Sequence, residues 1–101
     1  MQPSIIKYDK VLLVKTASSL KAIAHPVRLA IIDLLRDGKR LNVTQIHKAL
    51  GTEQAVTSQH LGILKEKDVL GSKRQGKHAY YFLKHPTLLD VIQTIMSTYE
   101  S

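Results

Sequence analysis

The chain has 101 residues, 44% of them hydrophobic, and a formal net charge of +7. This length suits one domain with a modest core, and the hydrophobic content argues against disorder. The sequence contains no cysteine, which excludes disulfides, thiolate zinc sites and thiol redox sensing. No apolar run reaches the ~18 residues of a membrane span. The N-terminal stretch lacks the pattern of a signal peptide, so we expect a cytoplasmic location.

The positive charge is concentrated in the middle of the chain. Nine of the fifteen Lys and Arg residues, but three of the eight acidic ones, lie between residues 39 and 84. A basic surface attracts polyanions, which points first to nucleic acid and second to an anionic membrane. An alternative interpretation is a charged surface that only keeps the protein in solution.

Two helices are expected before residue 38. The first, over residues 5–23, is predicted by apolar positions that recur with a helical period: Leu13, Ala17, Leu20 and Ala24. Its apolar face is widened by Val11, Leu12 and Val14. The second helix is mostly apolar and begins with Pro26, whose missing N–H needs no partner at that position. It ends at Asp37-Gly38, where Gly38 can adopt the left-handed conformation.

A short third helix over about residues 43–50 is predicted by Asn42 as its cap, with Gln45 as capping-box partner. Gly51 then breaks the chain, and we expect Thr52 to cap a fourth helix over about residues 53–67. Its expected core residues are Val56, Leu61 and Leu64, with Ile63 as a further candidate. Two short helices joined by a tight turn predict a helix-turn-helix, although helical hairpins that bind no nucleic acid share this spacing.

A basic hairpin and a final helix complete the pattern. Strands over residues 69–74 and 78–83 flank a turn in which Gly76 supplies positive φ. A basic hairpin directly after a helix-turn-helix is typical of a wing. Pro86 opens the last helix, which has Leu88, Ile92, Ile95 and Tyr99 on one face.

Three stretches, taken in order, resemble the ArsR family of bacterial winged-helix repressors: AIAHPVRLAIIDLL, QAVTSQHLGILKEKDVL and KRQGKHAYYFL. The resemblance covers roughly residues 17–99. It implies a homodimer built from the first and last helices, with the fourth helix in the DNA major groove. The residues agree, because both terminal helices have more apolar surface than so small a chain can bury internally.

The predicted fold is therefore mainly α with a small β-hairpin: a winged helix-turn-helix of order α-α-α-α-β-β-α in one domain over residues 1–101. Within it we expect dimerisation helices over 1–24 and 86–101, the helix-turn-helix over 42–67 and the wing over 69–84. The predicted partners are double-stranded DNA and a second copy of the chain, without a membrane. The residues expected at the dimer interface are Leu13, Ala17, Leu88, Ile92, Ile95 and Tyr99.

The candidate DNA-binding residues lie on the fourth helix and the wing. On the helix they are small or polar, which suits contacts to bases and phosphates: Gln54, Ala55, Thr57, Ser58, Gln59 and His60. His60 has the alternative of packing or capping within the domain. The wing offers Lys73, Arg74 and Lys77 to phosphates or the minor groove, and Lys39 and Arg40 are placed to reach the flanking backbone. The alternative interpretations are a solvated helix face and charges that protect an exposed strand edge.

We expect no metal site, cofactor or catalytic activity. The family resemblance implies two kinds of metal site. One needs a cysteine pair where this chain has Leu41 to Thr44, and the other needs a histidine pair that the last helix lacks. That region offers His85, Asp90 and Glu100, while His25 and His47 are isolated. Nothing in the sequence pairs a nucleophile with a base. Two other hypotheses stay open: a winged-helix module that binds protein or RNA, and a metal-responsive repressor with an unfamiliar ligand set.

Overall fold

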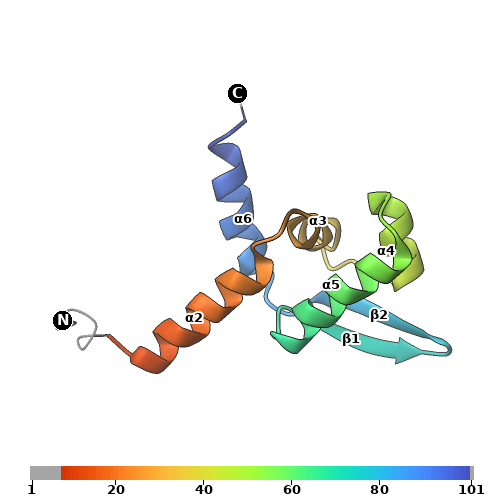
Figure 1. Ribbon diagram of the computed structural model, residues 1–101, viewed down its shortest axis with the longest axis horizontal. Helices are drawn as coiled ribbons and strands as arrows, with labels where there is room; N and C mark the ends of the chain where they lie inside the picture. Colours follow the sequence, from red (N-terminus) through yellow and green to blue (C-terminus); the bar gives the residue numbers. More distant parts are fainter. Residues whose placement is uncertain (1–7, 101) are drawn as a thin grey trace.

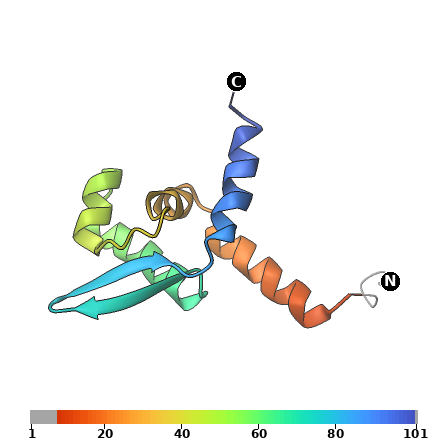
Figure 2. The ribbon, with the colours of Figure 1, turned by 180° about the vertical axis from the view of Figure 1, so that it is seen from behind.

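A computed structural model describes residues 8–100 and shows a winged helix-turn-helix. In chain order its elements are α2 (Lys10–Ile23), α3 (Pro26–Leu34), α4 (Val43–Leu50), α5 (Gln54–Glu66), β1 (Leu70–Gln75), β2 (His78–Leu83) and α6 (Thr87–Ser97). Helices α3, α4 and α5 and the hairpin form the body, from which α2 and α6 project in different directions (Figures 1 and 2). The predicted fold class and element order are confirmed.

The first helix begins later than the sequence predicts. Residues 5–7 of the expected helix lie outside the described residues, and α2 begins at Lys10. Its start is fixed by Asp9, whose carboxylate accepts a hydrogen bond from the Leu12 amide at 3.2 Å. An aspartate cap satisfies an amide that has no partner within the helix, so it defines the first turn.

Local signals set most of the other boundaries. Pro26 occupies the first turn of α3, and Gly51 ends α4 with φ of 68°. The capping box of α4 is present, with Asn42 and Gln45 each donating a backbone N–H to the other's side chain at 2.9 Å. The predicted cap of α5 is wrong, because Glu53 is the N-cap and its side chain makes no capping bond. Thr52 instead pairs with Thr57, through hydroxyl oxygens 2.7 Å apart.

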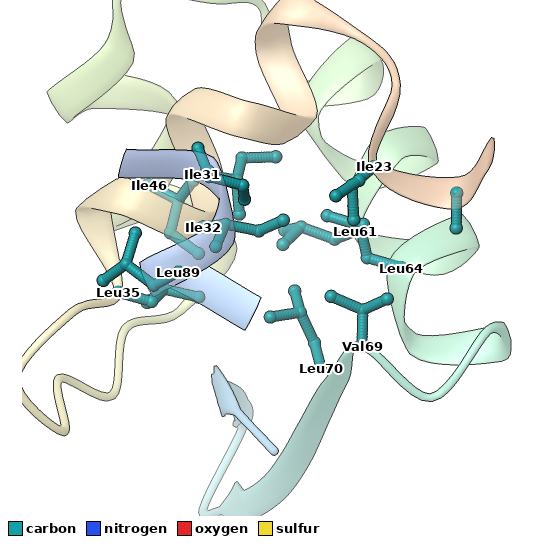
Figure 3. Close-up of a cluster of buried hydrophobic side chains, with 12 residues drawn as sticks. Ile23, Ile31, Ile32, Leu35, Ile46, Leu61, Leu64, Val69, Leu70 and Leu89 are labelled. Carbon is teal, nitrogen blue, oxygen red and sulfur yellow. The ribbon is translucent and has the colours of Figure 1, made fainter. Parts of the chain in front are cut away.

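The core lies between α3, the inner face of α5, the start of β1 and the first half of α6 (Figure 3). Its largest fully buried side chains are Ile31, Ile32, Leu35, Ile46, Leu61, Leu64, Leu70 and Thr57. The inner face of α5 is defined by residues 57, 61 and 64, which follow the helical repeat. Val56 lies off this face and is 37% exposed, so its predicted place in the core is wrong.

The predicted hairpin forms, with β1 one residue later than expected, and it gains an unpredicted neighbour. β1 pairs antiparallel with β2 from Leu70 opposite Leu83 to Gln75 opposite His78, and Gly76 in the turn has φ of 63°. Leu41 adds a bridge to β2. Its amide donates to the Tyr81 carbonyl at 3.1 Å, and the Tyr81 amide donates to the Leu41 carbonyl at 2.7 Å. The segment before α4 is therefore held against the wing.

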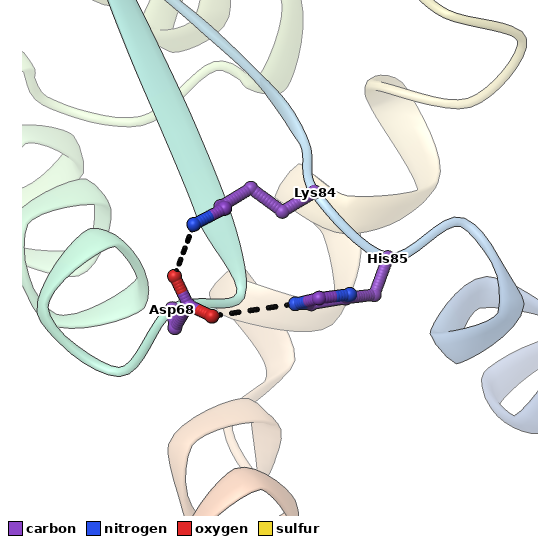
Figure 4. Close-up of polar contacts among 3 residues, drawn as sticks. All are labelled: Asp68, Lys84 and His85. Atoms are coloured by element: carbon purple, nitrogen blue, oxygen red, sulfur yellow. Dashed lines mark hydrogen bonds and ion pairs between the residues drawn. The ribbon is translucent and has the colours of Figure 1, made fainter.

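A polar contact joins the base of the hairpin to the start of α6 (Figure 4). Asp68, just after α5, accepts a hydrogen bond from the Lys84 ammonium, and the Nε2 atom of His85 lies 3.4 Å from its other carboxylate oxygen. Two contacts lower the pKa of Asp68: the hydrogen bond from Lys84, which has the larger effect, and the contact with His85. Both partners lie on the segment between β2 and α6, so the contact links the end of α5 to that segment.

Candidate nucleic-acid interface

One side of α5 presents an uninterrupted row of small and polar side chains. Gln54, Ala55, Ser58 and Gln59 are all exposed, whereas positions 57, 61 and 64 are buried. Gly62 extends the row without a side chain, and a Cβ at this position would meet nothing within 4 Å. The row carries hydrogen-bonding groups on a convex surface, the arrangement by which a helix can reach base edges in a major groove.

Thr57 does not belong to this row, and its predicted DNA contact is wrong. Its side chain is 0% exposed. The hydroxyl donates to the Glu53 carbonyl at 2.8 Å and also lies 2.7 Å from the Thr52 hydroxyl, in the turn between α4 and α5. The helical repeat explains the error, because residue 57 shares the inner face with Leu61 and Leu64.

Replacing Thr57 with valine is expected to reduce stability and leave DNA sequence preference unchanged. The substitution keeps the side-chain shape but removes a buried hydroxyl that bonds Thr52, at a cost of about 1 kcal/mol. Urea unfolding measures the loss, and Ser58→Ala is the matched control, because this exposed neighbour should change stability by no more than about 0.5 kcal/mol. A Thr57→Val protein with unchanged stability and altered base preference would show that Thr57 contacts DNA after all.

His60 is turned toward the body of the protein rather than toward the exposed row. Its Nδ1 atom accepts a hydrogen bond from Nε of Arg28 at 3.1 Å, and its ring centroid lies 4.4 Å from that of His25. Burial first, then the charges of His25 and Arg28, lower the pKa of His60. Of the two roles open to His60 from the sequence, the structure shows the packing role.

The wing carries its charges toward the tip. Lys73, Arg74 and Lys77 are exposed, while the base of the hairpin is buried at Leu70. On one face of the sheet, Lys73 stands opposite Tyr80 and Gln75 opposite His78. A hollow at this part of the hairpin is lined by Arg40, Lys73, Arg74, Gln75 and Tyr80. The hollow brings positively charged side chains together beside the Tyr80 ring, and such positive charge can bind the phosphate backbone of a nucleic acid.

Arg40 is part of this basic surface because of a tertiary contact. Its guanidinium lies 4.5 Å from the centre of the Phe82 ring, a cation–π geometry. The Phe82 ring also covers Gly71, where a Cβ would come within 2.6 Å of the ring. The sequence predicted a place for Arg40 beside the flanking DNA backbone but not this contact with the wing. Lys39 precedes it and is exposed.

Comparison with known proteins decides the family. Residues 25–70, from α3 to the start of β1, match the model of the bacterial regulatory protein ArsR family. The transcriptional repressor PagR of Bacillus anthracis is 42% identical over 79 residues, which cover 78% of this chain and 79% of PagR. The chain belongs to the ArsR family of bacterial regulatory proteins.

Solved structures agree with this assignment. The crystal structure of PagR matches this ArsR-family chain with a TM-score of 0.77 and 39% identity, covering 86% of this chain and 99% of PagR. The solution structure of a homodimeric winged helix-turn-helix DNA-binding domain from Mycobacterium bovis matches with a TM-score of 0.78 and 29% identity. That match covers 88% of this chain and 84% of the other.

The terminal helices of this ArsR-family protein leave apolar side chains exposed. On α6, Ile95 is 55% exposed and Met96 is exposed as well, and Tyr99 is exposed just after the helix ends. A groove of about 260 Å³ between α2, α3 and α6 is lined almost entirely by apolar atoms, from Leu20, Ile23, Ala24, Leu29, Ile92, Ile95 and Met96. On α2, the predicted interface residues Leu13 and Ala17 are exposed too.

Ile92 is the exception among the predicted interface residues. It is 3% exposed and belongs to the core cluster, because the first half of α6 packs against α3. Leu88 is half-buried against the same cluster. The sequence pattern could not separate the two roles, since a residue that packs in a core and one that packs in an interface both recur with the helical period.

Among residues 8–100, no three or more His, Cys, Asp and Glu side chains come together in a group that could hold a metal ion. Over the same residues, none of the helices combines the length and the apolar character that crossing a bilayer requires.

Proposed function

We propose that this protein is a homodimeric, sequence-specific DNA-binding transcription regulator that acts as a repressor or anti-repressor. The observation that carries the proposal is the exposed row of Gln54, Ala55, Ser58 and Gln59 on α5, next to a basic wing. Its relatives support it: PagR and the biofilm growth-associated repressor of Xylella fastidiosa, which is 33% identical over 89 residues, are named as repressors. We assign the protein no catalytic role and place it in the cytoplasm, with the DNA.

In this proposal α5 enters the major groove and its exposed row contacts base edges. Glutamine can bond adenine with both its amide oxygen and nitrogen, serine can bond bases or phosphates, and alanine can touch a thymine methyl group. Lys73, Arg74 and Lys77 of the wing contact phosphates, and Arg40 and Lys39 reach the backbone beside them. The terminal helices form the dimer, with Leu13, Ala17, Ile95 and Tyr99 at its interface and Leu88 at its edge.

Removing a base-reading side chain is expected to relax sequence preference. We expect Gln59→Ala or Ser58→Ala to cost about 1–3 kcal/mol on the preferred site and to change the selected base at particular positions. Selection of binding sites from random DNA by the wild-type protein first defines that site, and titrations of both variants against it give the cost.

Gln93→Ala is the matched control, because Gln93 is an exposed glutamine on α6, away from the proposed DNA surface. It should keep wild-type affinity and preference. If Gln59→Ala instead weakens binding to every sequence equally, α5 docks on DNA without reading it. Selection that yields no preferred sequence for the wild-type protein would overturn the proposed function itself.

We further propose that DNA release depends on neither thiol nor metal chemistry. The chain has no cysteine for oxidants or arsenite to attack, and tetrahedral zinc needs three or four ligands at once. The contact between Asp68 and His85 supplies two candidate ligands at most, and Lys84 already occupies the carboxylate. Control then comes from a small molecule, a protein partner or the cellular concentration of the dimer.

A further inference from the structure

Arg28 connects three helices at the point where α3 begins. Its Nη1 donates to the carbonyl of Ala22 near the end of α2 at 2.9 Å, and its Nε donates to Nδ1 of His60 on α5 at 3.1 Å. His25, the N-cap of α3, accepts a hydrogen bond from the Val27 amide through its own Nδ1 at 3.1 Å. The His25 and His60 rings are in contact, with centroids 4.4 Å apart and planes tilted by 45°.

This cluster is close to the residues assigned to base reading. His60 directly follows Ser58 and Gln59 on α5, so a bond that fixes His60 also fixes the rotation of the helix about its axis. The hydrogen bond is directional, because an N–H in the plane of the Arg28 guanidinium must point at one nitrogen of the His60 ring. The apolar contacts of Leu61 and Leu64 are not directional and tolerate small rotations of α5. A rotation of α5 would displace the exposed row relative to base edges, and misplacement weakens specific contacts more than phosphate contacts.

We propose that Arg28, His25 and His60 form a positioning cluster that holds α5 in the rotation at which Ser58 and Gln59 meet their bases. The inference rests on the proposed function, since it assigns these residues to the accuracy of DNA reading. His60 is therefore a positioning residue that acts through its neighbours on α5.

The geometry also assigns the proton on each ring. Both Nδ1 atoms accept hydrogen bonds, so each neutral imidazole carries its proton on Nε2. Arg28 from α3 and His25 from its N-cap are the charged or titratable groups that contact His60. Among residues 8–100 the ring has no ion pair with an acidic side chain. A proton on Nδ1 of His60 would remove the acceptor and place a cation beside Arg28.

Two substitutions at His60 separate positioning from folding. His60→Gln keeps a side-chain oxygen that can accept the Arg28 bond, whereas His60→Leu has similar bulk and no acceptor. The measurement is the ratio of affinities for the duplex selected from random DNA and for a scrambled duplex of equal length, with urea unfolding in parallel. We expect His60→Gln to keep this ratio within about threefold and His60→Leu to lower it about tenfold, with an unchanged salt dependence.

Two further measurements complete the test. Arg28→Lys keeps the charge but not the planar donor, so it should lower the ratio as His60→Leu does. His85→Gln, on the exposed contact with Asp68, is the matched control and should leave the ratio unchanged. Nitrogen-15 spectra of the imidazoles should show that His60 is the Nε2-protonated tautomer in the wild-type protein. In Arg28→Lys, the preference of His60 for this tautomer should be lost.

The outcomes are distinct. A His60→Leu protein with the wild-type ratio, or one that loses affinity for both duplexes equally, overturns the positioning role and leaves the proposed function intact. A His60 ring protonated on Nδ1 in the wild-type protein also overturns it. A wild-type protein that does not discriminate between the two duplexes overturns the proposed function, and the positioning role with it.

Discussion

Raising the salt concentration from 50 to 200 mM is expected to weaken DNA binding about 10³-fold. The dimer presents two wings, and if six phosphates are neutralised, log K should fall against log salt with a slope of about −5. The charges responsible are exposed on the wing and before α4, at Lys73, Arg74, Lys77, Lys39 and Arg40. Fluorescence anisotropy titrations over a series of salt concentrations measure the slope.

Variants assign the slope to the wing. Lys73→Ala should make the slope less steep by about 2 in a dimer that loses one phosphate contact per subunit, and it should weaken binding to all sequences alike. Lys10→Ala removes the same charge from the start of α2, at the end that points away from the body (Figure 1), and should leave the slope unchanged. Binding that stays constant up to a few hundred millimolar salt would rule out the proposed DNA contacts.

The Ile95→Glu substitution is expected to convert the protein into monomers and to reduce affinity for a two-half-site duplex by 100-fold or more. Ile95 is exposed beside the apolar groove between α2, α3 and α6, so a charge there would be buried unpaired in the proposed dimer. Each half-site would then be bound separately, without the gain of 10²–10⁴ that linkage provides. Sedimentation should give the 11.3 kDa chain mass instead of about twice that value.

Gln93→Glu is the control for this experiment. It introduces the same charge on another face of α6, among polar neighbours that include Asp90 and Arg36, and should stay dimeric. Ile92 is unsuitable for the purpose, since it lies in the core and a charge there would unfold the protomer. An Ile95→Glu protein that remains a dimer would place the interface elsewhere.

Features that depend on a few neighbouring residues were predictable from the sequence. The capping box of Asn42 and Gln45, the break in the chain at Gly51 and the positive φ of Gly76 all appear where predicted. In each case one residue supplies a bond or a backbone conformation to a neighbour no more than a few positions away. Together with the hydrophobic period, these signals suffice for the order of the elements.

The tertiary structure alone decided which side of each helix is covered, and by what. Thr57 is buried while Val56 is exposed, because the rotation of α5 follows from packing against α3 and not from hydropathy. Arg40 reaches the wing through the bridge of Leu41 to Tyr81, 40 positions away, and His60 meets Arg28 across 32 positions. Such contacts arise only when the core closes. A periodic sequence predicts that one face of a helix is apolar, but the free energy of the whole packed structure determines which element covers that face.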